Sequence, residues 1–197
     1  MIRGIIFGPG TLVLGGGAAL LVGFLAVGFI LPSTWQATAE ASIGAPLDSV
    51  QALLDSPEGW RRWTPWPDST APGPGPDKGP GASMTWSDPE LGSGAFRIVD
   101  VSGGASVDGP RTIAYAVEVE GAAGGALQTQ GTLTLQARGD STRVVWQEEG
   151  DLGSNPLMGY WALFMERAQG TEMGKSLDRL AEVAGGTQIT SSLAPTR

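Results

Sequence analysis

Three alternating runs decide the fold of this chain: RTIAYAVEVE (111–120), LQTQGTLTLQAR (127–138) and STRVVWQEEG (141–150). In the first run every second residue from Ile113 to Val119 is apolar or aromatic, whereas Glu118 falls on the other side. This period of two is typical of a strand with one buried face. Gly139 and Asp140 join the second run to the third, and so short a turn connects antiparallel neighbours. The sequence therefore predicts an antiparallel sheet at the centre of the fold.

The same pattern precedes these runs in further segments: TWQATAEASI (34–43), ASMTW (82–86) and GAFRIVDV (94–101). Before the second of them lies a Pro/Gly-rich stretch, residues 67–81, whose lack of apolar periodicity predicts an irregular and mobile connection. Neither flank of this stretch holds enough sequence for a core of its own, so a single domain is expected.

Two short helical segments are predicted between the first strand and this loop. In APLDSVQALLDS (45–56) Pro46 stands at the start, and apolar residues follow at helical spacing. In GWRRWTPWP (59–67) a tryptophan recurs every third residue, which predicts three indoles stacked along one edge.

One long helix is predicted to close the domain. Asn155 has the side chain of an N-cap, Pro156 suits the first helical position, and the pattern continues to Ala184. An apolar face is expected along the helix at Leu157, Trp161, Phe164, Ala168, Met173, Leu177 and Leu180. The tail, 186–197, has no pattern and is expected to be disordered. The order of elements predicts an α+β fold in which this helix covers one face of the sheet.

The composition excludes several kinds of chemistry. The chain has no Cys and no His, which removes thiolate nucleophiles, cysteine-ligated metals and the most common general base. We therefore expect no metal, no cofactor and no assigned catalytic residue. The formal net charge is -8, and Arg3 is the only charged residue before Glu40. Such an acidic domain repels phosphate backbones, which argues against a nucleic-acid partner.

The N-terminal segment, residues 5–32, is predicted to be a transmembrane helix. It carries no charged side chain, and a run of apolar residues from Leu12 to Leu31 would rise ~30 Å as a helix, which matches the bilayer core. Arg3 places the N terminus in the cytoplasm and the domain outside by the positive-inside tendency. The alternative is a cleaved signal peptide, because Ala37-Thr38-Ala39 has the form of a cleavage site.

Segments across residues 33–185 resemble the START-like (SRPBCC) superfamily, in particular its polyketide cyclase/dehydrase and lipid-transport branch. The segments that carry the resemblance are ASIGAP (41–46), WRRWTPW (60–66), GPGASMTW (79–86), GSGAFRIVDV (92–101), TRVVWQEEGDLG (142–153) and MERAQGTEMGKSLDRLAEVA (165–184). The resemblance implies a helix-grip fold, in which a curved sheet wraps the C-terminal helix around a hydrophobic cavity. It also implies binding or transport of apolar small molecules, and only some members of the family are enzymes.

The large side chains of the domain are the candidates for lining such a cavity, because ligand pockets are built from bulky aromatics and few polar groups. They are Trp63, Trp66, Met84, Trp86, Phe96, Tyr115, Trp146 and Trp161. Ordinary core packing explains each of them equally simply. Glu148 is a further candidate because it shares a strand face with Trp146, although the neighbouring acidic residues favour a solvated carboxylate.

Three functions are compatible with the sequence. The first is a membrane-anchored, non-catalytic domain that binds a hydrophobic or lipid-like molecule between the sheet and the C-terminal helix. The second is a cyclase/dehydratase-type enzyme that pairs Glu148 with Tyr115 or Tyr160. The third is an interaction module with a filled core that acts at the membrane.

Overall fold

The computed structural model describes residues 9–90, 92–104, 109–120, 126–153, 155–186 and 188–193. The elements follow in the order α1 (Pro9–Ile30), β1 (Thr34–Ile43), α2 (Leu47–Gln51), α3 (Pro57–Arg61), β2 (Ala71–Pro72), β3 (Ser83–Asp88), β4 (Gly92–Gly103), β5 (Arg111–Glu120), β6 (Ala126–Arg138), β7 (Ser141–Asp151), α4 (Met158–Val183) and β8 (Gln188–Leu193).

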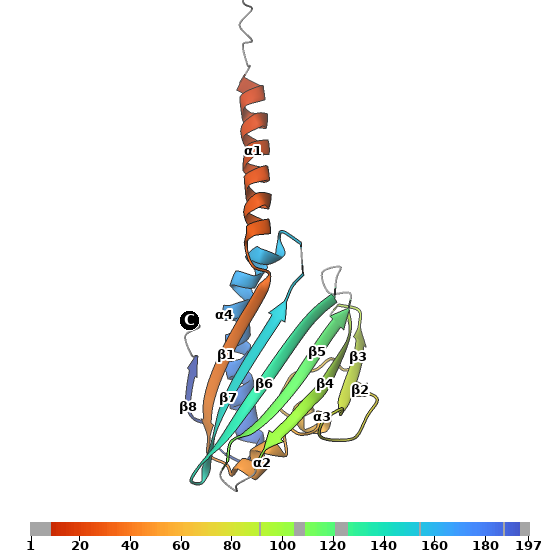
Figure 1. The fold of residues 1–197 in the computed structure, drawn as a ribbon, viewed down its shortest axis with the longest axis vertical. Coiled ribbons are helices and arrows are strands. Elements are labelled where there is room, and N and C mark those ends of the chain that lie inside the picture. The colour runs from red at the N-terminus through yellow and green to blue at the C-terminus, as the bar shows by residue number, and fades with distance from the viewer. Residues whose placement is uncertain are drawn as a thin grey trace, which may run out of the picture.

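One antiparallel sheet forms the body of the domain, with the strand order β2-β3-β4-β5-β6-β7-β1-β8. The sheet curves, and α4 packs along β1, close to the edge of the sheet formed by β8 (Figure 1). Short helices α2 and α3 lie at the lower end of the sheet, far from α1 (Figure 1). The predicted α+β arrangement of an antiparallel sheet and a C-terminal helix is confirmed, and its form is that of a helix-grip fold.

Interior glycines let aromatic rings lie flat on the inner face of the sheet. The pairs, directly opposite each other on neighbouring strands, are Gly94 with Trp86, Gly131 with Tyr115 and Gly150 with Trp35. A Cβ atom added to Gly131 would lie 2.1 Å from Cζ of Tyr115. Each glycine therefore supplies the space that the ring across from it fills.

The tryptophans of the predicted edge belong to the core instead. Trp60 and Trp63 are each 1% exposed, and their indole N–H groups donate to backbone oxygens of Leu54 at 2.8 Å and Leu53 at 3.2 Å. Trp66 is half-buried. The prediction of three stacked indoles is right only for Trp60 and Trp63, whose ring centroids are 4.6 Å apart; Trp66 lies beyond the end of α3 at Arg61 and packs against Trp86 instead.

Two other segments also differ from expectation. The predicted first helix contracts to Leu47–Gln51, followed by turns. The Pro/Gly-rich stretch contributes β2 and is held to the body, for example by the N–H of Gly81 donating to the oxygen of Ile98 at 2.8 Å. A stretch without apolar periodicity is thus ordered by its backbone hydrogen bonds.

Helix α4 has two halves with different surroundings. Its second half buries Met173, Leu177 and Leu180, as predicted, whereas Trp161 and Phe164 in the first half are 54% and 63% exposed. The predicted continuous apolar face is wrong, because the five-residue step from Ala168 to Met173 turns it by about 140° around the helix. The first half consequently presents Trp161 and Phe164 away from the sheet, while Ala162 on its other side is buried.

The ends of this helix also differ from the prediction. The helix begins at Met158, not Pro156, although the Oδ1 atom of Asn155 accepts from the N–H of Leu157 at 2.9 Å. The tail was expected to be disordered, but Gln188–Leu193 forms β8 beside β1. Residues 187 and 194–197 of the tail lie outside the described residues. Backbone pairing, which needs no side-chain pattern, explains the missed strand.

Helix α1 projects from the end of the domain where α4 begins (Figure 1). Its large side chains are exposed, including Leu20 at 78% and Ile30 at 82%. Of the predicted transmembrane segment, residues 5–8 lie outside the described residues, and side chains are described from Gly17 onward. In that described part of the chain, no helix is long and apolar enough to cross a membrane.

Candidate functional site

The site is built from one row of residues that crosses the inner face of the sheet. In register, Ala37 of β1 lies opposite Glu148 of β7, which lies opposite Gly131 of β6, which in turn lies opposite Tyr115 of β5. Because Gly131 has no side chain, the ring of Tyr115 covers it and extends toward Glu148. The row therefore brings together two polar groups that are separated by a whole strand.

A chain of hydrogen bonds joins the polar groups of this interior. The indole N–H of Trp146 donates to the Tyr115 hydroxyl oxygen at 2.7 Å, and that hydroxyl donates to Oε1 of Glu148. From the helix side, the amide of Gln169 donates to Oε2 of Glu148 at 2.5 Å. Both hydrogen-bond partners described for the Glu148 carboxyl are thus neutral donors.

Burial alters the acidity of both groups. Desolvation raises the pKa of Glu148, and the hydrogen bonds from Tyr115 and Gln169 oppose this only in part. Desolvation also raises the pKa of Tyr115 well above its usual value, and the charge of Glu148 raises it further. The raised pKa means that each group is harder to ionise than it is in water, and the hydrogen-bond partners described for Glu148 include no cation that would offset a negative charge.

Aromatic rings pack around the Tyr115 side of this pair. Trp60 lies at the centre of the cluster, with ring centroids 4.6 Å from Trp63 and 4.8 Å from both Phe96 and Tyr115. Trp63 is also 5.5 Å from Trp146 in edge-on contact. The result is an apolar interior with one polar anchor, the composition expected of a site for an apolar molecule with a polar end.

Most of the predicted lining residues meet here. Five of them belong to the cluster around the anchor: Trp63, Phe96, Tyr115, Trp146 and Glu148. Trp66 and Trp86 pair at 5.6 Å toward the β3 edge, and Met84 is buried. Trp161 is not among them, because it lies on the exposed side of α4, and its assignment to the cavity lining is corrected here.

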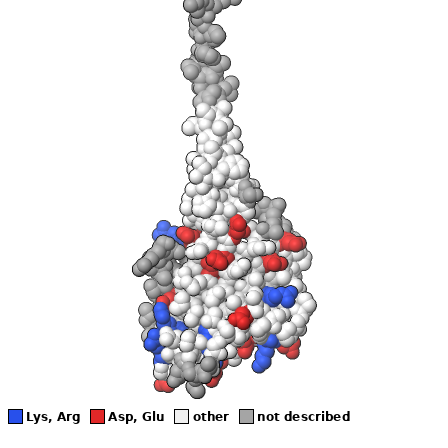
Figure 2. All heavy atoms as spheres, in the orientation of Figure 1, with Lys and Arg blue, Asp and Glu red and all other residues white. Residues whose placement is uncertain are grey.

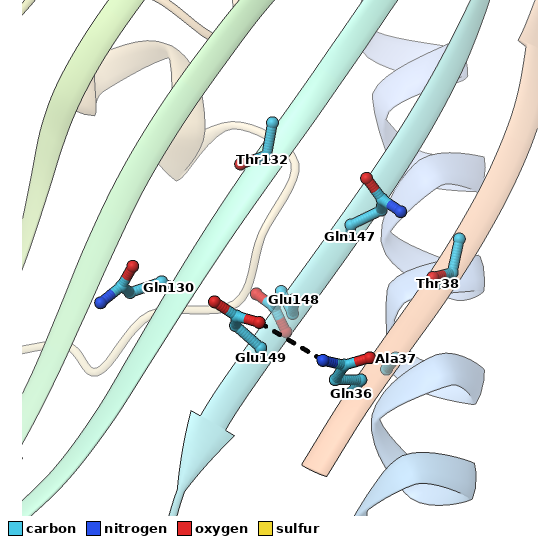
Figure 3. A pocket seen from close by; sticks show the side chains of 8 residues that line it. All are labelled: Gln36, Ala37, Thr38, Gln130, Thr132, Gln147, Glu148 and Glu149. Carbon is cyan, nitrogen blue, oxygen red and sulfur yellow. Dashed lines mark hydrogen bonds between the residues drawn. The ribbon is translucent and has the colours of Figure 1, made fainter. Parts of the chain in front are cut away.

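The favoured interpretation of Glu148 as a solvated carboxylate was wrong, since Glu148 is 7% exposed. Strand alternation separates it from its acidic neighbour: in Figure 3 the Glu148 side chain points behind β7, away from the face that carries Glu149. The alternative partner Tyr160 lies elsewhere, with its hydroxyl donating to the backbone oxygen of Phe24 at 2.8 Å.

Sequence reasoning missed three contributors to the site: Trp60, Gly131 and Gln169. The three-residue spacing of the tryptophans was a signal for the first. A glycine on the inner side of an alternating run was a signal for the second. Nothing in the sequence indicated the third, because the contact between Gln169 and Glu148 depends on how α4 lies on the sheet.

A separate hollow of about 290 Å³ opens on the outer face of the sheet over β6, β7 and β1 (Figure 3). Its polar side chains are those of Gln36, Thr38, Gln130, Thr132, Gln147 and Glu149. Among the described residues, no group of acidic side chains is placed to hold a metal ion. The outer hollow is thus lined by amides, hydroxyls and the carboxylate of Glu149.

The fold agrees with a comparison of the sequence with family models. The model for polyketide cyclase / dehydrase and lipid transport proteins matches residues 34–185. The chain belongs to this family. No curated protein matches the sequence. The matched region begins at β1 and ends beyond α4, so it excludes α1.

Solved structures share the fold. A hypothetical protein from Helicobacter pylori aligns with a TM-score of 0.58 and 12% identity, over 76% of this chain and 87% of that chain. Truncated norcoclaurine synthase from Thalictrum flavum aligns with a TM-score of 0.55 and 12% identity, over 76% and 92%. A protein from Mesorhizobium loti aligns with a TM-score of 0.53 and 14% identity, over 76% and 96%. At these identities the similarity concerns the fold alone.

Proposed function

We propose that this protein binds a hydrophobic or lipid-like small molecule between the sheet and α4, without chemical conversion, while α1 anchors it to a membrane. The observation that carries the proposal is the buried Tyr115–Glu148 pair inside an aromatic interior. A buried carboxyl without a cation costs stability, and structure alone does not require one at this position. Its use would be to orient the polar end of an apolar ligand.

Entry to this interior would follow from movement of the first half of α4. Gln169, which contacts Glu148, is itself only half-buried. Gly170 and Gly174 lie just beyond it, and glycine inside a helix weakens the local structure. Displacing this part of α4 would uncover the Glu148 carboxyl while the second half of the helix stays packed at Leu177 and Leu180.

Membrane anchoring is supported by the exposed and uncharged surface of α1. White atoms, which are neither acidic nor basic, cover the described part of α1 and the neck where it joins the domain (Figure 2). An exposed apolar helix of this kind favours lipid over water. The positive-inside tendency of Arg3 would leave the N terminus in the cytoplasm and the domain outside.

The same pair also suits a cyclase/dehydratase-type enzyme, because two groups with raised pKa values can pass a proton to a substrate. The distinction is whether a bound molecule changes. Incubating the protein with the extracted ligand and measuring the mass and the chromatographic retention of the ligand over time would decide between them: no change in either supports binding alone, whereas a loss of water, or a new retention time at the same mass from ring closure, supports catalysis.

The test of binding is native mass spectrometry of the gently purified full chain, with organic extraction, followed by titration with a fluorescent naphthalene probe. We expect a stoichiometric apolar adduct. Tyr115→Phe and Glu148→Gln should weaken probe binding several-fold, whereas Glu149→Gln, which alters the adjacent carboxyl on the outer face, should not. An apo mass together with no probe binding would contradict the proposal and favour the filled-core interaction module.

A further inference from the structure

The start of α4 carries an apolar surface that packing within the domain does not explain. Leu157, Trp161 and Phe164 are 43%, 54% and 63% exposed, and they follow one another at spacings of four and three residues, so they share one side of the helix. We call these residues the α4 stripe. Trp161 and Phe164 are in edge-on contact at 5.9 Å, which makes one continuous aromatic surface.

Charge is absent from the whole segment that bears the stripe. From Leu152 to Met165 no side chain is acidic or basic, and charged residues resume with Glu166 and Arg167. This contrasts with the net charge of -8 of the chain. A wholly neutral segment in an acidic protein avoids the cost of bringing charge close to hydrocarbon.

The stripe also lies at the level of α1. The rings of Phe24 and Tyr160 stack at 4.5 Å with planes 5° apart, and the Tyr160 hydroxyl donates to the oxygen of Phe24 at 2.8 Å. A Cβ added to Gly28 would lie 2.1 Å from the oxygen of Pro156, so the two backbones touch. The first turn of α4 therefore lies against the last two turns of α1.

We infer that the α4 stripe inserts into the headgroup region of the same bilayer that α1 enters. The inference rests on the proposed anchoring by α1 and extends it to the domain itself. The seven helical steps from Leu157 to Phe164 rise ~10 Å along the helix, comparable with the interfacial layer outside the hydrocarbon core. Tryptophan is enriched in that layer because its ring is apolar and its N–H is polar.

Contact with the bilayer would hold the first half of α4, and with it Gln169, against the lipid surface. The half of the helix that covers the Tyr115–Glu148 pair is then the half that meets lipid. A lipid-like ligand would reach the interior from the bilayer without crossing water.

The test uses the absence of cysteine from the chain, which permits single nitroxide labels without a background. Phe164→Cys reports on the stripe, Leu20→Cys reports on α1, and Glu172→Cys, exposed further along α4, is the aqueous control. The full-length variants are reconstituted in phosphatidylcholine vesicles. The accessibility of each label to oxygen, which prefers lipid, and to a water-soluble nickel chelate is measured.

We expect the oxygen-to-nickel ratio at Phe164→Cys to lie several-fold above that at Glu172→Cys and below that at Leu20→Cys. A ratio at Phe164→Cys equal to that at Glu172→Cys, with a lipid-like value at Leu20→Cys, overturns the inference but leaves the anchor intact. An aqueous value at Leu20→Cys overturns both. Spin–spin broadening at Phe164→Cys that is lost on dilution with unlabelled protein would show a second copy on the stripe, which also overturns the inference.

Discussion

Gly131→Ala is the change that tests most directly how the interior is built. Its backbone is not in the left-handed region, so alanine is compatible with the local conformation. The added Cβ would lie 2.1 Å from Cζ and 2.3 Å from the hydroxyl oxygen of Tyr115. A contact that short cannot be tolerated, so the ring must move and lose its place between Trp146 and Glu148.

The magnitude follows from these contacts. Overpacking of a filled core costs about 1–3 kcal/mol. Moving the Tyr115 hydroxyl leaves the Trp146 indole N–H and the Glu148 carboxyl without this partner, at about 1–3 kcal/mol for each group. The gain from replacing glycine within a strand is about 0.5–1 kcal/mol. We expect a net loss of about 5 kcal/mol in the free energy of unfolding.

Urea denaturation, followed by tryptophan fluorescence, measures this loss. The matched control is Gly174→Ala on α4, where an added Cβ meets nothing within 4 Å, and which should stabilise the protein by up to about 1 kcal/mol. In a Tyr115→Ala background, Gly131→Ala should change stability by less than about 1 kcal/mol, because the ring it displaces is gone. An equally large loss in that background would refute the account of Tyr115 filling the space over Gly131.

Three further predictions concern the site and its support. Glu148→Gln should change the pH dependence of stability: because burial raises the folded-state pKa of Glu148, its contribution is full below the unfolded pKa and is lost as pH rises through the folded value. The stability of the native protein minus that of Glu148→Gln should therefore fall with rising pH in denaturation series, and a flat difference would contradict this; Glu149→Gln should show no such trend. Ser56→Ala should cost about 1 kcal/mol, because Ser56 accepts from the N–H of Gly59 at 3.1 Å as the N-cap of α3, and an unchanged urea midpoint would argue against the cap. Trp63→Ala should cost about 3–5 kcal/mol in the same assay, since Trp63 is 1% exposed, and a loss below 1 kcal/mol would mean that its ring is not packed.

The interior site was only partly predictable. Alternation along a strand places Tyr115 and Glu148 on faces, but it does not say which face of β7 is buried when Glu149 and Asp151 lie beside it. Pairing with β1 and β6 decides this, because Ala37 and Gly131 leave room for Glu148 on the inner side. The acidic neighbours therefore favoured a solvated Glu148. The pairing of β7 with β1 and β6 buries its carboxyl instead.

The sequence by itself determined β1, β3, β4, β5, β6 and β7, the C-terminal helix and the family, because each depends on local periodicity or on segments such as TRVVWQEEGDLG. Only the tertiary structure decided that Trp161 faces outward, since the side of α4 that meets the sheet is set by the docking of Met173 and Leu177. Only it joined Gln169 to Glu148, residues on different elements whose distance no periodicity encodes. Local patterns constrain which face a residue occupies, whereas long-range packing selects what covers that face.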